Sequence, residues 1–223
     1  GVKYMSIKIA IAGVGNCASA LVQGIAFYRE NPNAAGLMHK EIGGYKPQDI
    51  EVVAAFDVDR RKVGKSLKEA LLSDPNCATI FHKDLPDFPV TVQMGPVLDG
   101  ISEHTKKYAE ERSFSVSDQP PCDVVKVLKE SGADMLINYV PVGSEEVAHY
   151  YAEACLEANV GFINAMPSFI VSDPKWAKKF EEKNIPAIGD DIKSQLGATI
   201  VHRVLTDLFE KRGIKLNKTY QLN

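Results

Sequence analysis

Residues 6–20 read SIKIAIAGVGNCASA, and this stretch decides the fold of the chain. Its first seven residues form an apolar run rich in isoleucine, which predicts a buried strand. Gly13 and Gly15 predict a tight turn, and Leu21, Val22 and Ile25 follow at helical spacing. A strand, a glycine turn and an amphipathic helix in this order predict the first unit of a dinucleotide-binding α/β fold.

The glycine turn has the pattern G-x-G-x-x-A, in which each small residue has a physical reason. Gly13 permits the tight turn, Gly15 lets the backbone approach a pyrophosphate, and Ala18 allows close packing of helix on strand. Free N–H groups and the helix dipole favour an anion at this point. The alternative is a purely structural turn. We expect NAD to be bound here by Gly13, Val14, Gly15, Asn16, Cys17 and Ala18.

An acidic residue, Asp57, directly follows the second apolar run, EVVAAF at 51–56. A carboxylate at this position can accept hydrogen bonds from the adenosine ribose and repels the extra phosphate of NADP, so it favours NAD. The usual gap from the glycines is about 20 residues, and an excursion over 29–49 accounts for the larger gap here. A surface aspartate that caps the next helix is one alternative, and Asp59 is a less favoured ribose acid.

Helical and strand patterns alternate along the rest of the chain, which predicts a doubly wound, Rossmann-type parallel sheet. Further strands are expected over 133–140, 160–164 and 186–188. Helices are expected over 59–72, 122–131, 173–184 and 192–212, and Ser144 is expected to cap one more. Insertions are expected at about 29–49 and 74–121.

Composition excludes several classes of function. The chain has 223 residues and a net charge of −3, which gives no electrostatic reason to expect nucleic acid or an anionic membrane as partner. Its apolar runs are too short to span a bilayer. The four cysteines have no metal-ligand spacing, so no metal site is expected. They are typical of reduced thiols in a cytoplasmic protein.

Two further turns follow predicted strands and should lie at the same edge of the sheet, where ligands bind. The first contains Asn138, Tyr139 and Pro141, and the second contains Asn164 and Ala165. We expect both to lie near the nicotinamide half of the cofactor. An asparagine at a strand end is also a common turn former, and that alternative stays open.

The most unusual segment is GDDIKSQ at 189–195. One carboxylate would suffice to cap the helix that follows, but Asp190 and Asp191 are adjacent. Lys193 is unfavourable near the positive end of a helix unless it meets a bound anion. A phosphate held by Lys193, the Ser194 hydroxyl and helix N–H groups would fit.

Several segments together resemble myo-inositol-1-phosphate synthase, particularly its prokaryotic branch. GDDIKSQLGATIVHR at 189–203 is the most specific of them, whereas the glycine turn alone is not specific. The others are IAGVGNCASAL at 11–21, VTVQMGPVLDG at 90–100, NYVPVGSEE at 138–146, FINAMPSFI at 162–170 and TYQLN at 219–223.

The resemblance implies an isomerase that converts D-glucose 6-phosphate to 1D-myo-inositol 3-phosphate, also called inositol 1-phosphate. In that family NAD oxidises C5 transiently, an enolate attacks C1, and the stored hydride then reduces the ring, so net redox is zero. The resemblance also implies a cytoplasmic homotetramer that serves inositol and phospholipid biosynthesis.

Residue roles follow from the same resemblance. The GDD-K-S segment contacts nicotinamide and substrate phosphate in the family, which makes Asp191, Lys193 and Ser194 the expected catalytic residues. Asp190 and Asp191 are expected beside the cofactor. The turn at 97–100, with Asp99 and Gly100, is expected to be a cofactor neighbour, as is Asn164.

The family continues past TYQLN into a catalytic domain with lysines that hold the phosphate. We therefore expect residues 1–200 to form the NAD-binding domain and residues 201–223 to begin the catalytic and oligomerisation domain. The 223 residues are expected to bind NAD without a complete active site.

Two rival hypotheses remain. An NAD-dependent sugar-phosphate dehydrogenase would produce net NADH, which the synthase reaction does not. A non-catalytic NAD-binding module would bind NAD without any effect of sugar phosphate or of Lys193→Ala.

Overall fold

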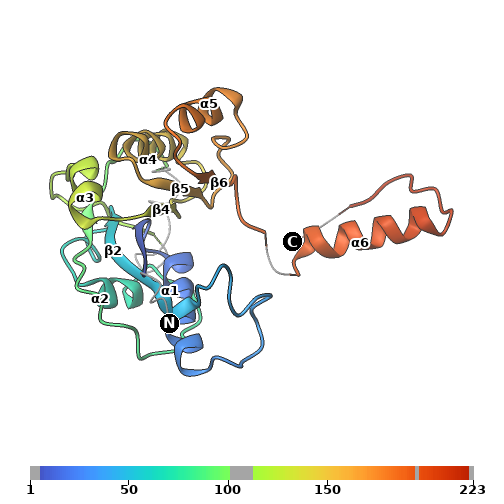
Figure 1. The fold of residues 1–223 in the computed structure, drawn as a ribbon, viewed down its shortest axis with the longest axis horizontal. Helices are drawn as coiled ribbons and strands as arrows, with labels where there is room; N and C mark the ends of the chain where they lie inside the picture. Colours follow the sequence, from blue (N-terminus) through green and yellow to red (C-terminus); the bar gives the residue numbers. More distant parts are fainter. Residues whose placement is uncertain (1–5, 101–112, 194–195, 221–223) are drawn as a thin grey trace. The chain divides into compact units, whose positions relative to one another are not determined.

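The computed structural model describes residues 6–100, 113–193 and 196–220 (Figure 1). Its elements are β1 Ile7–Ala12, α1 Asn16–Glu30, the short 3-10 helix η1 Pro47–Asp49, β2 Ile50–Asp57, α2 Leu67–Leu72, β3 Gln93–Met94, α3 Val124–Ser131, β4 Met135–Asn138, α4 Glu145–Ala158, β5 Gly161–Asn164, α5 Pro174–Glu182, β6 Ala187–Ile188 and α6 Ala198–Lys211.

Six strands form one sheet in the order β3-β2-β1-β4-β5-β6. Every neighbouring pair is parallel, from β2–β3 at one edge to β5–β6 at the other. This is the strand order of a doubly wound dinucleotide-binding fold, with the order reversing between β1 and β4. The predicted fold class is therefore confirmed.

Strand β1 is buried on both faces, as its continuous apolar sequence predicts. Ile9 and Ile11 belong to a core on one face, which α1 and α2 cover. Ala10 and Ala12 belong to a second core on the other face, which α3, α4 and α5 cover (Figure 1). The alternation of side chains along one strand thus divides the hydrophobic interior into two layers.

The helix expected over 59–72 is mostly wrong. Residues 59–65 form turns, and only Leu67–Leu72 is helical. The Asp59 carboxylate accepts a hydrogen bond from Arg61 N–H (2.8 Å) and holds this segment in a turn. Gly64 has φ +83°, a backbone conformation that a right-handed helix does not contain. Ser66 then caps α2 in a reciprocal pair with Glu69.

Two compact units make up the chain, Gly1–Asp190 and Asp191–Asn223. The first contains the whole sheet, and the second contains α6. The expected domain boundary at residue 200 falls inside α6, which begins at Ala198 after the N-cap Gly197. The helix expected to begin at residue 192 therefore begins later, at Ala198.

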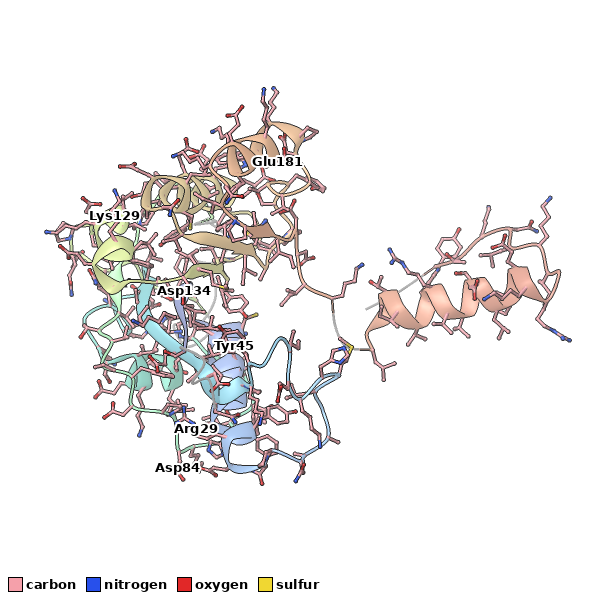
Figure 2. The ribbon with its side chains drawn as sticks, viewed as in Figure 1. Arg29, Tyr45, Asp84, Lys129, Asp134 and Glu181 are labelled. Carbon is pink, nitrogen blue, oxygen red and sulfur yellow. The ribbon has the colours of Figure 1, made fainter. Side chains whose placement is uncertain are left out.

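Charged side chains such as Lys129 on α3 and Glu181 on α5 are exposed on the outer helices (Figure 2). In the described part of the chain, no helix combines the length and the apolar character that crossing a membrane requires.

Candidate functional site

The predicted site residues follow the carboxyl ends of parallel strands, so the topology places them along one edge of the sheet. The glycine turn follows β1, Asp57 ends β2, Asn138 ends β4, Asn164 ends β5, and Asp190 follows β6. The strand order reverses between β1 and β4, and sheets of this kind bind their ligands at the carboxyl ends of the strands beside such a point.

Gly13 has no room for a side chain. Its φ is +92°, and a Cβ there would lie 2.6 Å from the main-chain oxygen of Tyr139. Its N–H donates to Phe56 O (2.9 Å), and Tyr139 N–H donates to Ala12 O (2.7 Å). The turn is thus pressed against the ends of β2 and β4, which only glycine permits.

Gly15 is the N-cap of α1 and, in contrast, faces open space. Among the described residues, a Cβ at Gly15 would meet nothing within 4 Å. Ser19 N–H donates to Gly15 O (2.9 Å), which is the first hydrogen bond of the helix. The N–H groups of residues 16–18 precede it and have no acceptor within the helix. No acidic residue occupies that turn, and Ala18 is fully buried against the sheet. This helix start can receive an anion.

The Asp57 carboxylate lies against the glycine turn. Its Oδ2 accepts from Val14 N–H (2.7 Å), and its Oδ1 accepts from Val58 N–H (2.7 Å) and Asp59 N–H (2.8 Å). The side chain is half-buried. A carboxylate offers about four lone-pair sites, so Asp57 keeps capacity for a ribose hydroxyl beside the turn.

Asp59, the less favoured ribose acid, is already engaged. The residue is buried, and its two oxygens accept hydrogen bonds from Arg61 and from Ser115 N–H (2.9 Å). Burial alone would raise the pKa of Asp59, but the hydrogen bonds and charge of Arg61 and the Ser115 N–H lower it. Asp59 therefore fastens the turn after β2 to the segment around Ser115.

A chain of hydrogen-bonded polar side chains crosses the ends of β4, β5 and β6. Asn138 Nδ2 donates to Asn164 Oδ1 (3.0 Å), and Asn164 Nδ2 donates to Asp190 Oδ1 (2.8 Å). Both asparagines are fully buried. These partners fix the orientations of the two amides, so a buried and ordered polar chain joins the ends of β4, β5 and β6.

Asp190 clamps the loop after β5. Its oxygens accept from Asn164 and also from Ile170 N–H, Val171 N–H and both donors of Ser172, at 2.7–3.1 Å. Burial alone would raise the pKa of Asp190, but the hydrogen bonds from Asn164, Ser172 and Val171 lower it. With five hydrogen bonds accepted, this carboxylate positions its neighbours and is not a free base.

Asp99 binds the start of α4. Its carboxylate accepts from Glu146 N–H (2.8 Å) and Val147 N–H (3.1 Å). Ser144 is the N-cap residue by position, but its side chain makes no capping hydrogen bond. Gly100 packs so closely on Ser144 that a Cβ would lie 2.0 Å from its Oγ. The turn at 97–100 is thus fastened to the same edge.

The remaining predicted cofactor neighbours surround the glycine turn and β4. Burial, with a smaller effect of Cys17, raises the pKa of Tyr139 to about 12, so its phenol stays neutral. Pro141 and Cys17 are exposed. Ala165 N–H donates to Asn138 O (3.1 Å), which continues the contact between the ends of β4 and β5.

The expected catalytic residues belong to the second unit. Asp191 is exposed with φ +70°, and its Oδ1 accepts from Ile192 N–H (2.8 Å). Lys193 is also exposed. Ser194 lies outside the described residues. Asp190 therefore belongs to the polar chain of the first unit, whereas Asp191 and Lys193 belong to the second unit.

Two features of the site have no simple signal in the sequence. Lys62 is buried and donates to Val14 O (2.5 Å). Ser168 is 1% exposed, and its Oγ has no partner among the described residues, although its main-chain oxygen accepts from Asn164 (2.7 Å). Lys62 belongs to no recognisable motif, and although Ser168 lies in the FINAMPSFI segment at 162–170, nothing in that segment predicts that its hydroxyl is buried.

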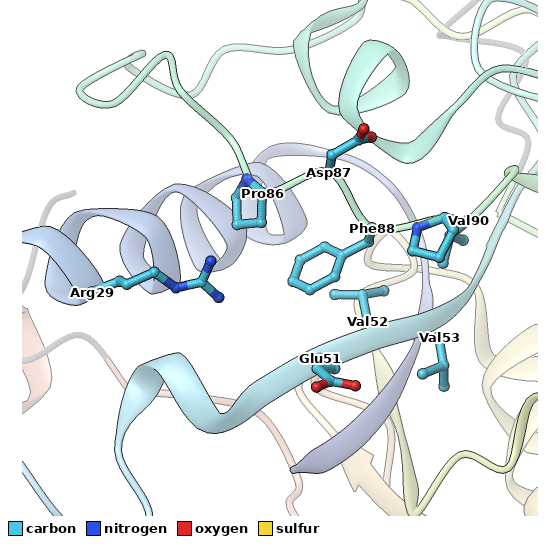
Figure 3. Close-up of a pocket in the computed structure, with 9 residues that line it drawn as sticks. Arg29, Glu51, Val52, Val53, Pro86, Asp87, Phe88 and Val90 are labelled. Carbon is cyan, nitrogen blue, oxygen red and sulfur yellow. The ribbon is translucent and has the colours of Figure 1, made fainter.

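A pocket of about 380 Å³ lies elsewhere, beside the first residues of β2 and so at the far end of that strand from Asp57 (Figure 3). Its lining includes Arg29, Glu51, Val52 and Phe88. It contains none of the predicted site residues. Among the described residues, no cluster of three or more His, Cys, Asp or Glu side chains could hold a metal ion.

Comparison with known proteins gives close relatives over nearly the whole chain. It is 54% identical over 220 residues to an inositol-3-phosphate synthase of Mycolicibacterium smegmatis, which covers 97% of this chain and 59% of the relative. It is 50% identical over 221 residues to the inositol-3-phosphate synthase of Corynebacterium glutamicum, covering 98% of this chain and 59% of the relative. The chain thus spans about 59% of the length of these relatives.

Among solved structures, the crystal structure of Ari2 superposes with a TM-score of 0.78 at 35% sequence identity. The match covers 93% of this chain and 61% of that chain. No family model matches the sequence.

Proposed function

We propose that this chain supplies the NAD-binding unit of an inositol-3-phosphate synthase, since it is 54% and 50% identical to two such enzymes over the 59% of their length that it spans. The proposed reaction of the whole enzyme is isomerisation of D-glucose 6-phosphate to 1D-myo-inositol 3-phosphate. NAD would supply transient oxidation and return the hydride, so that no NADH accumulates.

The observation that carries this proposal is the contrast between the two glycines of the turn. The Cβ position of Gly13 lies 2.6 Å from Tyr139 O, whereas no atom of the described part of the chain lies within 4 Å of the Cβ position of Gly15. A structural turn needs only the first glycine. The second is explained by a ligand that approaches the backbone, as a pyrophosphate does.

Asp57 supports NAD over NADP. Its carboxylate is held beside the turn by Val14 N–H, at the end of β2 where the adenosine ribose would lie. A 2′-phosphate there would meet a negative charge at short range. The polar chain of Asn138, Asn164 and Asp190 would face the nicotinamide end, and its saturated hydrogen bonds would hold that edge rigid.

Asp191, Lys193 and Ser194 are proposed to act on the sugar phosphate and nicotinamide once the rest of the enzyme is in place. Lys193 would neutralise the substrate phosphate, and the Ser194 hydroxyl would donate to it. We further infer a cytoplasmic homotetramer that makes inositol phosphate for phospholipid synthesis. These inferences rest on the family and its reaction.

Turnover with glucose 6-phosphate and substoichiometric NAD tests the reaction. We expect the 223 residues to bind NAD but to turn over slowly or not at all, because they span 59% of the relatives. The full-length enzyme should form inositol phosphate without accumulation of NADH. Conversion of the NAD to NADH, with substrate loss that stops when the NAD is used up, would contradict the synthase reaction and favour a dehydrogenase. Rapid turnover by the 223 residues alone would contradict an incomplete active site.

A further inference from the structure

Lys62 is a buried lysine whose ammonium group is bound by main-chain carbonyls. It lies in the turns that follow β2 and is 2% exposed. In the described part of the chain, its ammonium forms no ion pair, and its hydrogen bonds go to two main-chain carbonyls. Lysine is almost never fully buried unless it is paired. Such a costly placement calls for a specific role of the ammonium group.

The first partner of Lys62 is the glycine turn itself. Lys62 Nζ donates to Val14 O (2.5 Å), while Val14 N–H donates to Asp57 Oδ2 (2.7 Å). The two peptide groups on either side of Val14 are therefore held by two charged side chains of opposite sign. Asp57 ends β2, and Lys62 lies in the turns that directly follow it. The flanking glycines would otherwise leave these peptides free to rotate.

The second partner of Lys62 is the loop after α2. Lys62 Nζ also donates to Pro75 O (3.3 Å). Two residues further, Cys77 N–H donates to Asn16 Oδ1 (2.7 Å), at the first residue of α1. The loop is thus fastened to the glycine turn through Lys62 and to the helix start through Asn16. Lys62 thus connects the glycine turn and this loop through its two hydrogen bonds.

The pKa of Lys62 is lowered, because burial outweighs the nearby carboxylates of Asp57, Asp59 and Asp74, which raise it, and Arg61 lowers it further. The ammonium donates its hydrogen bond to the Val14 carbonyl oxygen and therefore does not compete for an anion's hydrogen bonds with the N–H groups at the helix start. An ammonium behind the turn adds positive charge where an anion would approach.

We propose that Lys62 is a positioning residue for the ADP half of the dinucleotide. It fixes the Val14 peptide in the orientation that presents the turn to the pyrophosphate, and it holds the 74–77 loop against the start of α1. This inference rests on the proposed NAD site at the turn. It assigns a role to a residue of the β2–α2 connection, which does not belong to the glycine motif.

The test measures ADP-ribose affinity by calorimetry in Lys62→Met, which keeps the length of the side chain and removes the cation. Loss of a charged hydrogen bond predicts an affinity about tenfold to a hundredfold weaker. Lys65→Met removes the same charge from an exposed neighbour and should bind like the wild type. Lys62→Arg, which keeps a cation and its donors, should recover most of the affinity.

A purely structural role is tested with Leu128→Ala, which removes a buried side chain of α3 from the core on the other face of the sheet. This variant should lower the melting temperature without loss of ADP-ribose affinity. Unchanged affinity in folded Lys62→Met would overturn the proposal, as would an equal loss in Leu128→Ala.

If Lys62→Met does not fold, ¹⁵N NMR of the wild-type lysine ammonium groups decides. A Lys62 resonance that shifts on addition of ADP-ribose supports the proposal, and one that does not shift overturns it. Failure of the wild type to bind ADP-ribose at all would instead refute the NAD site, and the role of Lys62 with it.

Discussion

Replacing Gly13 with alanine should destabilise the protein severely, because the added methyl group has nowhere to go. The Cβ would lie 2.6 Å from Tyr139 O, 2.7 Å from Tyr139 C and 3.0 Å from Val140 N. All three are main-chain atoms, and Tyr139 N–H is itself bonded to Ala12 O (2.7 Å). Relief of the contact therefore requires β1 and β4 to move apart.

The magnitude has two parts. A non-glycine residue in a left-handed backbone conformation costs about 1–2 kcal/mol, and Gly13 has φ +92°. Overpacking in a rigid environment adds about 1–3 kcal/mol. Gly13→Ala should thus lower the free energy of unfolding by about 2–5 kcal/mol, a large part of the stability of an ordinary domain.

The assay is urea unfolding followed by circular dichroism, with the slope compared between variants so that a change in the unfolded state is recognised. Two glycines of the same region serve as matched controls. Gly24 lies within α1 with nothing within 4 Å of its Cβ position, so Gly24→Ala should stabilise the chain by about 0.5–1 kcal/mol. Gly15→Ala should leave stability nearly unchanged and weaken NAD binding.

An unfolding free energy of Gly13→Ala within about 0.5 kcal/mol of wild type, the range of a neutral surface change, would refute this reasoning. It would mean that the ends of β1 and β4 are not pressed together at the turn. A stability loss in Gly15→Ala equal to that in Gly13→Ala would equally contradict the contrast between the two glycines.

Three further variants test the edge of the sheet, each by urea unfolding. Asp99→Ala should cost about 0.5–2 kcal/mol by uncapping α4, and no loss would show that Ser144 suffices as the cap. Asn164→Leu should cost about 1–3 kcal/mol because it removes the acceptor of the buried Asn138 Nδ2 and the side-chain donor to Ser168 O, and a stable variant would contradict the buried chain. Asp190→Asn should be less stable than wild type near neutral pH. Since the folded-state pKa of Asp190 lies below the ordinary 3.8, the stabilisation is present above that value and is lost as the pH falls through the folded pKa. The difference between the two proteins should therefore shrink in acid, and a constant difference would contradict the role of the carboxylate.

Local patterns in the sequence were sufficient where the structure depends on neighbouring residues. The strand, turn and helix of residues 7–30 follow from apolar periodicity and two glycines. The Asp173 cap of α5, with Pro174 as its first residue, also follows from adjacent residues. The parallel architecture follows from the alternation of such units.

Contacts between distant residues could not be predicted in this way. Asp99, 47 positions before Glu146, caps α4 in place of the adjacent Ser144. Lys62 reaches Val14 across 48 positions. The helix expected from Asp59 fails because that carboxylate binds Arg61 and Ser115, and the latter is 56 positions away. Such partners are set by the packing of the whole sheet.

Calorimetric titration of the 223-residue chain with NAD and with NADP tests the central claim most directly. The open approach at Gly15 and the Asp57 carboxylate beside the turn predict that NAD binds and that NADP binds at least about tenfold more weakly, since placing a 2′-phosphate against a carboxylate costs about 1.4 kcal/mol or more. Absence of NAD binding, or equal affinity for the two dinucleotides, would contradict the account.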